Sequence, residues 1–405
     1  MANLTADPAA YSSRWSLIFA AIGHFYFHFF TAMYFTIVLG LGDTFDQPFH
    51  ELIELWTLGA LLVGLAALPA GKLADMFGPA KVMAVFFVGM GIACVGAGAV
   101  SGPTALMIML AGVGLFGAIY HPVGIPWVIR NSDTATGKML AVNGVFGGLG
   151  AAAAGSITGM LVDVLGWRAA FWIPGAICVA SGLHLWWYIF SGRVVEPTGS
   201  TAGEGGHSRG EAIRGFTVLL VSMFIAGIIY HATQAVLPKF FTERVPDFVE
   251  GSVFKAGVLV TIVYGVAAVM QLIGGHLADR YPLKRVYVIC WLVQIGFLAA
   301  LAGGTGLTVF ATAILLATIS TAQLPAENML LARFTPERHH GLAFGLKFVL
   351  AFGAAPLAIE IVSFVRAQTG DFFMLFAGLS AVTAFVFLVV LLLPADRRMA
   401  VAAAE

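Results

Sequence analysis

The chain has 405 residues, of which 60% are hydrophobic and only 10% are charged, whereas an average soluble domain carries about 25% charged residues. A water-soluble core cannot hide so much apolar surface. Stretches of about 20 mostly apolar residues, the length of one bilayer crossing, recur along almost the whole sequence. The net charge is zero and there is no basic tract, so the composition excludes a nucleic-acid partner and predicts a polytopic protein of the lipid bilayer.

Apolar runs between charged or Gly/Pro breaks predict an all-α membrane protein with twelve transmembrane helices. The expected ranges are 15–41, 52–74, 82–100, 104–129, 139–164, 170–191, 215–241, 254–276, 286–303, 307–332, 342–365 and 372–394. Residues 193–214 are polar, glycine-rich and without periodicity, so we expect a cytoplasmic linker there. The linker would join a six-helix bundle at 1–192 to a second one at 215–405.

The distribution of Lys and Arg predicts the orientation of these helices, because cytoplasmic loops carry the excess of positive charge. With both termini inside, 15 of the 21 basic residues fall on the cytoplasmic side and five on the outer side, and Lys347 remains within a helix. We therefore expect a multi-pass protein of the cell inner membrane with both termini in the cytoplasm.

The two halves of the sequence match each other at a constant shift of 204 residues. Gly71-Lys72-Leu73-Ala74-Asp75 corresponds to Gly275-His276-Leu277-Ala278-Asp279. The same shift relates three further pairs, which are Gly137 and Gly341, Asn143 and Lys347, and Gly166 and Gly370. Separate anchors that agree on one shift indicate a duplication, with two bundles related by a pseudo-two-fold axis along the membrane normal.

The loop at Gly71–Lys81 resembles the G-x-L-A-D-R-x-G-R-K signature between the second and third helices of the major facilitator superfamily, and Gly275–Arg285 repeats it in the second half. Length, linker, orientation and repeat extend the resemblance over the whole chain. It implies a secondary transporter that works by alternating access. In that family the aspartate of the loop faces a helix N-terminus and favours the outward-open state, so Asp75 and its counterpart Asp279 are the expected gating residues.

A narrower set of residues is similar to fosmidomycin-resistance-type exporters. It consists of Gly117-Ala118-Ile119-Tyr120-His121-Pro122, an aromatic-His-Pro element, and of a histidine early in the first helix, His24. The acidic residue that those exporters carry one turn later is His28 here, so the proton site of those exporters is not transferred to this chain. This resemblance implies efflux of a drug or toxic compound.

Ionisable groups inside membrane helices cost about 2.5–3.5 kcal/mol each and usually face a cavity or a partner, so they are the candidate site residues. Residues three and four apart share one helix face. His24, His28 and Thr31 form such a stripe, and His231 and Gln234 form another. The remaining substrate-binding candidates are His121, Asn143, Glu327, Asn328 and Lys347. We expect them in one central cavity formed by the helices at 15–41, 104–129, 139–164, 215–241, 307–332 and 342–365.

Lys347 and Glu327 both lie about 10 Å from the cytoplasmic ends of their helices, given a rise of 1.5 Å per residue, so the two side chains are within reach of each other. One interpretation is a structural ion pair that only holds helices together. The other makes Lys347 the counter-charge of an anionic substrate, with Glu327 either competing for Lys347 or carrying a proton. His28 is the second candidate for proton coupling, because imidazole titrates near neutral pH.

These residues favour a proton-coupled transporter of a small organic solute, anionic or zwitterionic because basic and imidazole groups outnumber acids in the predicted helices. The alternatives are drug efflux by proton antiport and a non-transporting membrane sensor or assembly factor. The expected partners are the solute, protons or another coupling ion, and lipid, with the chain as a monomer. A Walker loop, an H-E-x-x-H motif and paired cysteines are all missing, so we expect no enzyme, no cofactor and no metal site.

Overall fold

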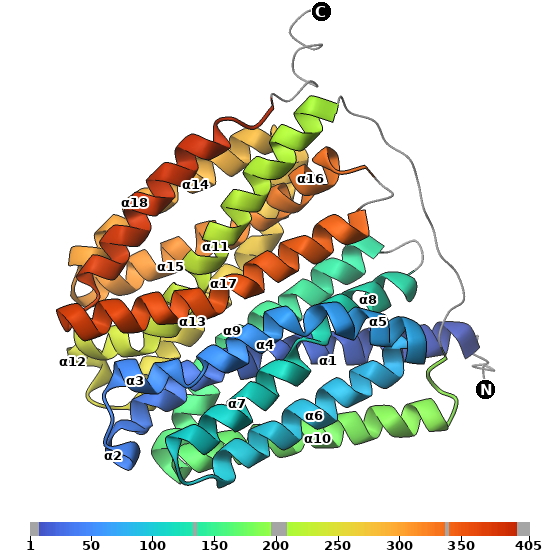
Figure 1. Cartoon of the computed structure of the whole chain (residues 1–405), viewed down its shortest axis with the longest axis horizontal. Coiled ribbons are helices and arrows are strands. Elements are labelled where there is room, and N and C mark those ends of the chain that lie inside the picture. The colour runs from blue at the N-terminus through green and yellow to red at the C-terminus, as the bar shows by residue number, and fades with distance from the viewer. Residues whose placement is uncertain (1–7, 133–135, 196–208, 337–339, 395–405) are drawn as a thin grey trace, which may run out of the picture. The chain divides into compact units, whose positions relative to one another are not determined.

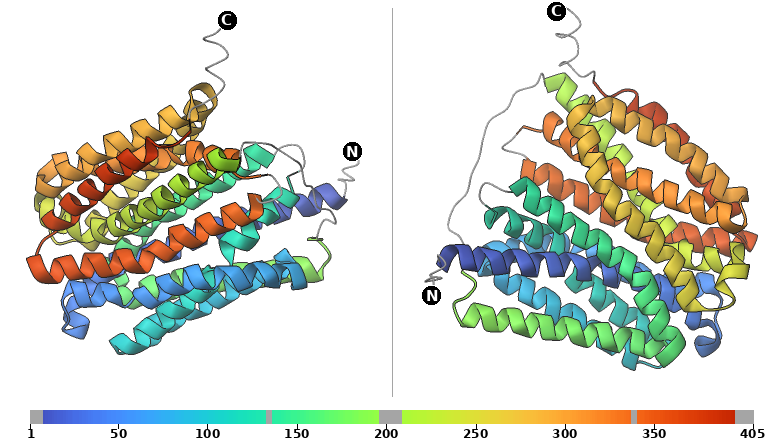
Figure 2. Two further views of the ribbon diagram at one scale, coloured as in Figure 1. Left: turned by 45° about the horizontal axis from the view of Figure 1, so that its top comes forward. Right: turned by 180° about the vertical axis from the view of Figure 1, so that it is seen from behind.

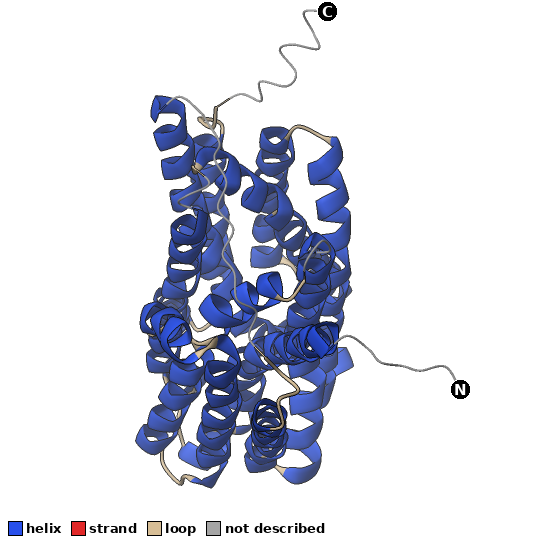
Figure 3. Cartoon of the chain, turned by 90° about the vertical axis from the view of Figure 1, so that its right-hand side faces the viewer, coloured by secondary structure: helices blue, strands red, loops and turns tan. Residues whose placement is uncertain are grey.

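The computed structural model describes residues 8–132, 136–195, 209–336 and 340–394. Within these ranges the chain is helical and contains no strand (Figure 3). Eleven helices are long and apolar enough to cross a membrane, and one bent pair raises that number to twelve. The expected all-α membrane fold with about twelve transmembrane helices is therefore confirmed.

The chain divides into two compact units, Met1–Ser200 and Thr201–Glu405 (Figure 1). The helices of the first unit begin with a long segment that is followed by two short ones, α1 (Pro8–Ile37), η1 (Val38–Gly40) and α2 (Gly42–Phe45). The others are α3 (Phe49–Glu54), α4 (Thr57–Leu65), α5 (Ala67–Phe77), α6 (Pro79–Ala99), α7 (Pro103–Gly117), η2 (Tyr120–Gly124), α8 (Ile125–Arg130), α9 (Thr136–Leu165) and α10 (Trp167–Phe190).

The second unit contains the helices α11 (Arg209–Arg244), α12 (Pro246–Val249), α13 (Val253–Arg280), α14 (Leu283–Gly303), α15 (Gly306–Ala322), α16 (Leu324–Phe334), α17 (His340–Thr369) and α18 (Phe373–Val390). Helix α11 begins six residues before the expected position, because 209–214 form its first turns instead of the end of the linker. This segment lacks proline, and Glu211 in the first turn complements the positive end of the helix dipole. Residues 193–195 of the expected linker follow α10 as non-helical chain, and 196–208 lie outside the described residues.

The helix predicted at 52–74 is broken into α3, α4 and α5. The segments Phe49–Leu65 and Ala67–Phe77 meet at an angle of 48°. Pro69 explains the bend, because it has no N–H to donate to the carbonyl of Leu65 and its ring crowds that carbonyl.

The fourth membrane segment of each unit is also interrupted beside a proline. In the first unit, α7 and α8 are separated by the π-helical turn η2, which contains Pro122. In the second unit, α15 ends before Gln323, and Pro325 occupies the first turn of α16. Hydropathy predicts one continuous helix at each place, whereas a proline removes a backbone donor and so favours a break.

The internal repeat extends to the ends of the helices. A shift of 204 residues carries both ends of α6 onto α14 and both ends of α9 onto α17. The residues that follow α9 and α17 are Gly166 and Gly370, with φ angles of 85° and 71°. A glycine in this left-handed region ends a helix without the steric cost that a side chain would add. The duplication inferred from sequence therefore also sets where these helices end.

Close helix contacts position the polar residues of each unit. In the first unit α9 lies along α1 (Figure 2), and a Cβ at Gly150 would come within 2.1 Å of the carbonyl oxygen of Phe25. In the second unit α13 approaches α15 in the same way at Gly274, where a Cβ would lie 2.2 Å from the carbonyl oxygen of Ala322. Small residues thus let the backbones approach where lipid offers no hydrophobic driving force.

Replacing Gly370 by Ala is expected to lower the free energy of unfolding by about 1 kcal/mol, because an L-residue is disfavoured at positive φ. A Cβ there meets nothing within 4 Å, so the cost is one of backbone conformation alone. Gly353→Ala in the interior of the same helix is the matched control and is expected to be neutral or slightly stabilising. Unfolding titrations in detergent measure both, and equal effects of the two substitutions would contradict the role of Gly370.

Candidate functional site

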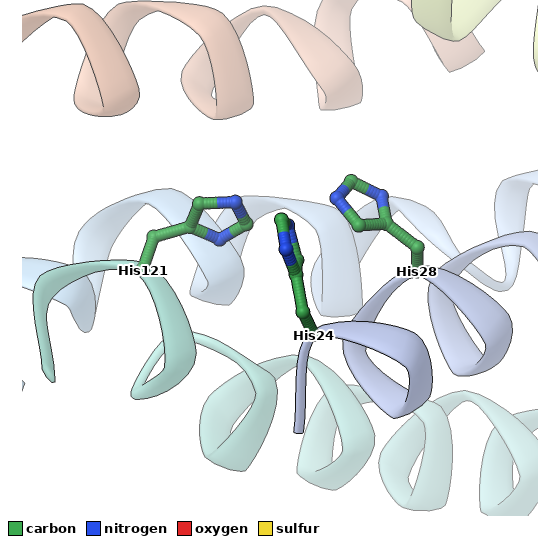
Figure 4. Close-up of side chains that lie close together, drawn as sticks. All are labelled: His24, His28 and His121. Atoms are coloured by element: carbon green, nitrogen blue, oxygen red, sulfur yellow. The ribbon is translucent and has the colours of Figure 1, made fainter. Parts of the chain in front are cut away.

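Three histidines of the first unit gather at one place. His24 and His28 lie one turn apart on α1, and His121 comes from η2, so the cluster joins two segments distant in sequence (Figure 4). The ring centroids are 4.9 Å apart for His24 and His28, 5.4 Å for His24 and His121, and 5.7 Å for His28 and His121. His24 and His121 are buried, whereas His28 is half-buried. The two histidines predicted on one face of the first helix are therefore joined by a third imidazole from η2.

Asn143 of α9 fixes the orientation of His24. Nδ1 of His24 lies 2.7 Å from the backbone carbonyl oxygen of Asn143. Nδ1 also lies 3.2 Å from the side-chain nitrogen of Asn143. The shorter contact is the one to the carbonyl oxygen, which only accepts, so His24 donates from Nδ1–H and carries its lone pair on Nε2. The ring of Tyr120 stacks on the same imidazole at 4.8 Å with an interplanar angle of 18°. His24 is thus held by a hydrogen bond at one edge and by an aromatic ring on one face.

Tyr120, the aromatic residue of the aromatic-His-Pro element, is a residue of this site that was not among the predicted substrate-binding residues. Its hydroxyl lies 2.9 Å from the carbonyl oxygen of Ala20 and 2.9 Å from the side-chain oxygen of Asn143, so it links α1 to α9. Gly23 and Gly124 leave room for the ring, because a Cβ at either position would come within 3.0 Å of it. A tyrosine next to His121 in an apolar run was the available signal.

The second unit contains a buried ion pair. Nζ of Lys347 on α17 lies 2.7 Å from Oε1 of Glu327 on α16, and it donates to the side-chain oxygen of Asn328 at 2.5 Å. Glu327 is 2% exposed and Lys347 is 7% exposed. The contact that depth along the helices suggested between these two residues is therefore present.

The carboxylate of Glu327 has a second partner that the sequence analysis missed. The hydroxyl of Tyr287 on α14 donates to Oε2 of Glu327 at 3.0 Å, and it lies 2.9 Å from the hydroxyl oxygen of Ser222 on α11. Both Tyr287 and Ser222 are fully buried. The network thus connects α11, α14, α16 and α17 through polar atoms in an apolar interior.

Three further candidates have partners on their own helix or on a neighbouring helix. Thr31 donates its hydroxyl to the carbonyl oxygen of Phe27 at 2.9 Å, within its own helix. Gln234 donates to the hydroxyl of Tyr230 at 3.0 Å, and the ring of His231 packs near that of Phe352 at 6.2 Å. These contacts do not test the substrate-binding role of the three residues, which stays a prediction.

The two expected gating residues differ in their surroundings. Asp75, near the end of α5, pairs with Arg130 at the end of α8 at 3.8 Å, and both side chains are exposed. Asp279, near the end of α13, is exposed, and among the described residues it has no ion-pair partner. The gating role of both aspartates stays a prediction, as does the single cavity expected to contain all ten substrate-binding candidates.

The two polar clusters occupy matching places in the repeat and differ in chemistry. Asn143 and Lys347 are related by the shift of 204 residues, and each contacts the interrupted fourth segment of its own unit. The first unit thereby presents imidazole nitrogens without a carboxylate among them, which suits proton transfer or ligation of a cation. The second presents one acid and one base, which suits exchange of a counter-ion.

The sequence model of the Major Facilitator Superfamily matches residues 20–248 and 219–405. The chain is similar to the puromycin resistance protein of Streptomyces alboniger, with 31% identity over 151 residues, which are 36% of this chain and 29% of that protein. It is also similar to the tetracenomycin C resistance and export protein of Streptomyces glaucescens, with 30% identity over 153 residues, 36% and 28% of the two chains. The match thus spans less than a third of each relative.

Solved structures agree with the fold over almost the whole chain. A bacterial homologue of the human lysosomal transporter Spinster, inward-facing and unoccupied, has a TM-score of 0.66 at 15% identity and covers 94% of this chain and 95% of its own. The occupied inward-facing structure has a TM-score of 0.67 at 16% identity, with 94% of each chain covered. At this identity the likeness is one of fold. Together with the family match across both units, it establishes that the chain belongs to the major facilitator superfamily, whose members are membrane transporters and not enzymes.

Proposed function

We propose that this chain is a secondary active transporter that moves a small anionic or zwitterionic organic solute across the inner membrane by alternating access, coupled to protons. In this proposal it acts as a monomer with both termini in the cytoplasm. The observation that carries the proposal is the buried pair of Lys347 and Glu327, because a charged side chain inside a membrane helix is expensive and is retained mainly for function.

Lys347 is already arranged to bind an anion. Its ammonium group faces a carboxylate oxygen and an amide oxygen within 2.7 Å, so it sits among acceptors of the kind that an anionic solute offers. If a substrate carboxylate or phosphonate replaced Glu327 at Nζ, the ammonium of Lys347 would donate a charge-assisted hydrogen bond to it. Substrate and Glu327 then compete for one cation.

Charge balance couples this competition to a proton. When an anion takes over Lys347, the carboxylate of Glu327 is left without its cation in an apolar interior, which costs several kcal/mol. A proton on Glu327 removes that charge, and the Tyr287 hydroxyl remains within hydrogen-bond distance. The loaded state then contains one extra anion and one extra proton and has the same net charge as the empty state. The scheme is therefore electroneutral symport of one proton with one negative charge of solute.

Export of a toxic compound by proton antiport is the second candidate, favoured by the similarity to two resistance proteins. In that scheme a cationic compound competes with Lys347, and with protons, for the carboxylate of Glu327. The two schemes therefore differ in the charge of the solute and in whether its binding takes up or releases a proton.

Removing one member of the ion pair is expected to destabilise the protein more than removing both. Glu327→Leu leaves an uncompensated buried ammonium and is expected to cost about 3–5 kcal/mol of unfolding free energy, whereas Glu327→Leu with Lys347→Met recovers most of the loss. Lys255→Met breaks an exposed pair with Glu250 and serves as the control, with no change in the unfolding transition expected. A double variant as unstable as the single one would show that the two charges are not a compensated pair.

The transport scheme is tested on purified protein in proteoliposomes that enclose a pH-sensitive dye. Thermal-shift screening of carboxylates, phosphonates and cationic amphiphiles first selects a ligand. We expect an anionic ligand to drive proton uptake with wild-type protein. Glu327→Gln is expected to abolish proton uptake while counterflow of the solute persists, and Glu250→Gln, an exposed carboxylate, is expected to match wild type.

The outcomes separate the candidate functions. Proton release on binding of a cationic ligand would replace symport of an anion by drug antiport. Counterflow and proton coupling that are unchanged in the Glu327→Gln variant would remove the ion pair from the mechanism. Absence of counterflow for every ligand that binds would favour a non-transporting sensor or assembly factor.

A further inference from the structure

We propose that His24, His28 and His121 form a binding site for one divalent transition-metal ion of the zinc, cobalt and nickel group, with one coordination position left for a donor from outside the chain. Among the described residues these three are the group of His, Cys, Asp and Glu side chains with ligand atoms close enough to share an ion. The expectation of no metal site rested on linear motifs, which do not register ligands from two separate segments.

The ligand set indicates the class of metal. Three neutral imidazoles are borderline donors that suit Zn, Ni and Co, whereas Mg²⁺ and Ca²⁺ prefer carboxylate, carbonyl and water oxygens. Three imidazolium cations packed this closely in a buried place would repel one another strongly. Neutral rings avoid this repulsion, and neutral imidazole is the form that binds a metal ion.

The distances fit a site that contracts slightly on binding. The three ligand nitrogens lie within 4.8 Å of one another. Tetrahedral zinc holds imidazole nitrogens at 2.0–2.1 Å, which places them about 3.3 Å apart. Rotation of the imidazole side chains closes the difference, and His28 is half-buried whereas the other two rings are buried. Its exposure also provides a route by which an ion reaches the two buried rings.

His24 has the surroundings of a metal ligand. A histidine that binds a metal usually donates its other ring N–H to a carbonyl or carboxylate, which sets the tautomer. His24 does so through Nδ1 to the carbonyl oxygen of Asn143, and Nε2 is left as the ligand atom. Tyr120 stacks on His24, and the ring of Phe27 lies edge-on at 4.9 Å from His28 and at 4.5 Å from His121. Each imidazole is therefore supported by an aromatic ring.

The backbone conformation around His121 also supports a metal site. The turn Tyr120–Gly124 is π-helical, a conformation that is rare and occurs frequently at functional sites. Pro122 prevents regular α-helical bonding at this place. The turn thus presents the third imidazole toward the pair on α1.

The open position suggests what the site does in transport. Zinc sites with three protein ligands keep the fourth position for water or substrate. No carboxylate or thiol of the described residues completes this group, so an anionic solute with oxygen or nitrogen donors is the natural fourth ligand. This step rests on the proposed function and narrows the solute to metal-chelating anions.

Binding of Co²⁺ to the purified full-length protein tests the site directly. The protein is used in detergent without a polyhistidine tag, after chelator treatment, and the visible spectrum of Co²⁺ reports tetrahedral nitrogen coordination. We expect one tightly bound Co²⁺ with a tetrahedral spectrum, displaced by Zn²⁺ and perturbed by azide at the open position. His184→Gln, an exposed histidine of the same unit, is expected to bind as wild type.

Variants assign the ligands. His24→Gln, His28→Gln and His121→Gln are each expected to weaken Co²⁺ binding more than about 100-fold, because even partners beyond the ligands contribute about 10–100-fold. Gly147→Ala retains all three histidines but places a Cβ 2.6 Å from Nε2 of His24, so it is expected to weaken binding by about tenfold or more through displacement of that ring. Size-exclusion profiles identify variants that fail to fold. If the histidine variants do not fold, weaker Co²⁺ binding by the Gly147→Ala variant identifies His24 as a ligand.

Two results would overturn the proposal. One is a wild-type protein that binds no Co²⁺ above the triple His→Gln variant, and the other is an octahedral spectrum that persists in all single variants. If solute transport is observed while Co²⁺ binding is absent, the metal site alone is wrong. If Co²⁺ binds as expected but no solute is transported, the metal site stands and the proposed function fails.

Discussion

A charged or strongly polar group buried at membrane depth is costly without a partner inside the protein, because the hydrocarbon of a bilayer supplies none. The ammonium of Lys347 and the carboxylate of Glu327 meet this requirement for each other, and Tyr287 and Asn328 occupy further positions around the pair. In the first unit the amide of Asn143 and the hydroxyl of Tyr120 do the same among neutral groups. Helix order, glycine contacts and broken segments all serve to bring such partners together across the apolar interior.

Much of this fold could be predicted from the sequence, because hydropathy and repetition are local and periodic signals. Twelve apolar runs, the shift of 204 residues and the pairing of Lys347 with Glu327 follow from position along the chain alone. The third histidine could not be assigned to the cluster of His24 and His28, because that contact depends on how η2 packs against α1. The contact of Tyr287 with Glu327 could not be predicted for the same reason, since the Tyr287 hydroxyl comes from a different helix.

The prolines that break the helices can be read from the sequence, but the positions and angles of the breaks cannot. Pro69, Pro122 and Pro325 all lie inside apolar runs that are long enough to span a membrane, and hydropathy alone does not register the donors they remove. Both interrupted fourth segments lie next to a polar cluster. Free backbone groups at membrane depth are tolerated only where protein or water satisfies them, so breaks and polar side chains occur together.

The π-helical turn at Tyr120–Gly124 also divides the fourth segment of the first unit into two parts whose side chains are offset from each other around the helix axis. A π turn holds about one residue more than an α turn, so each residue after it lies about 100° behind the position around the helix axis that an unbroken α-helix would give it. The side of α7 that packs against its neighbours is therefore offset around the axis from the side of α8 that packs against its own neighbours. A single transmembrane segment can in this way pack one stripe against α6 and α4 and turn a different one toward α9.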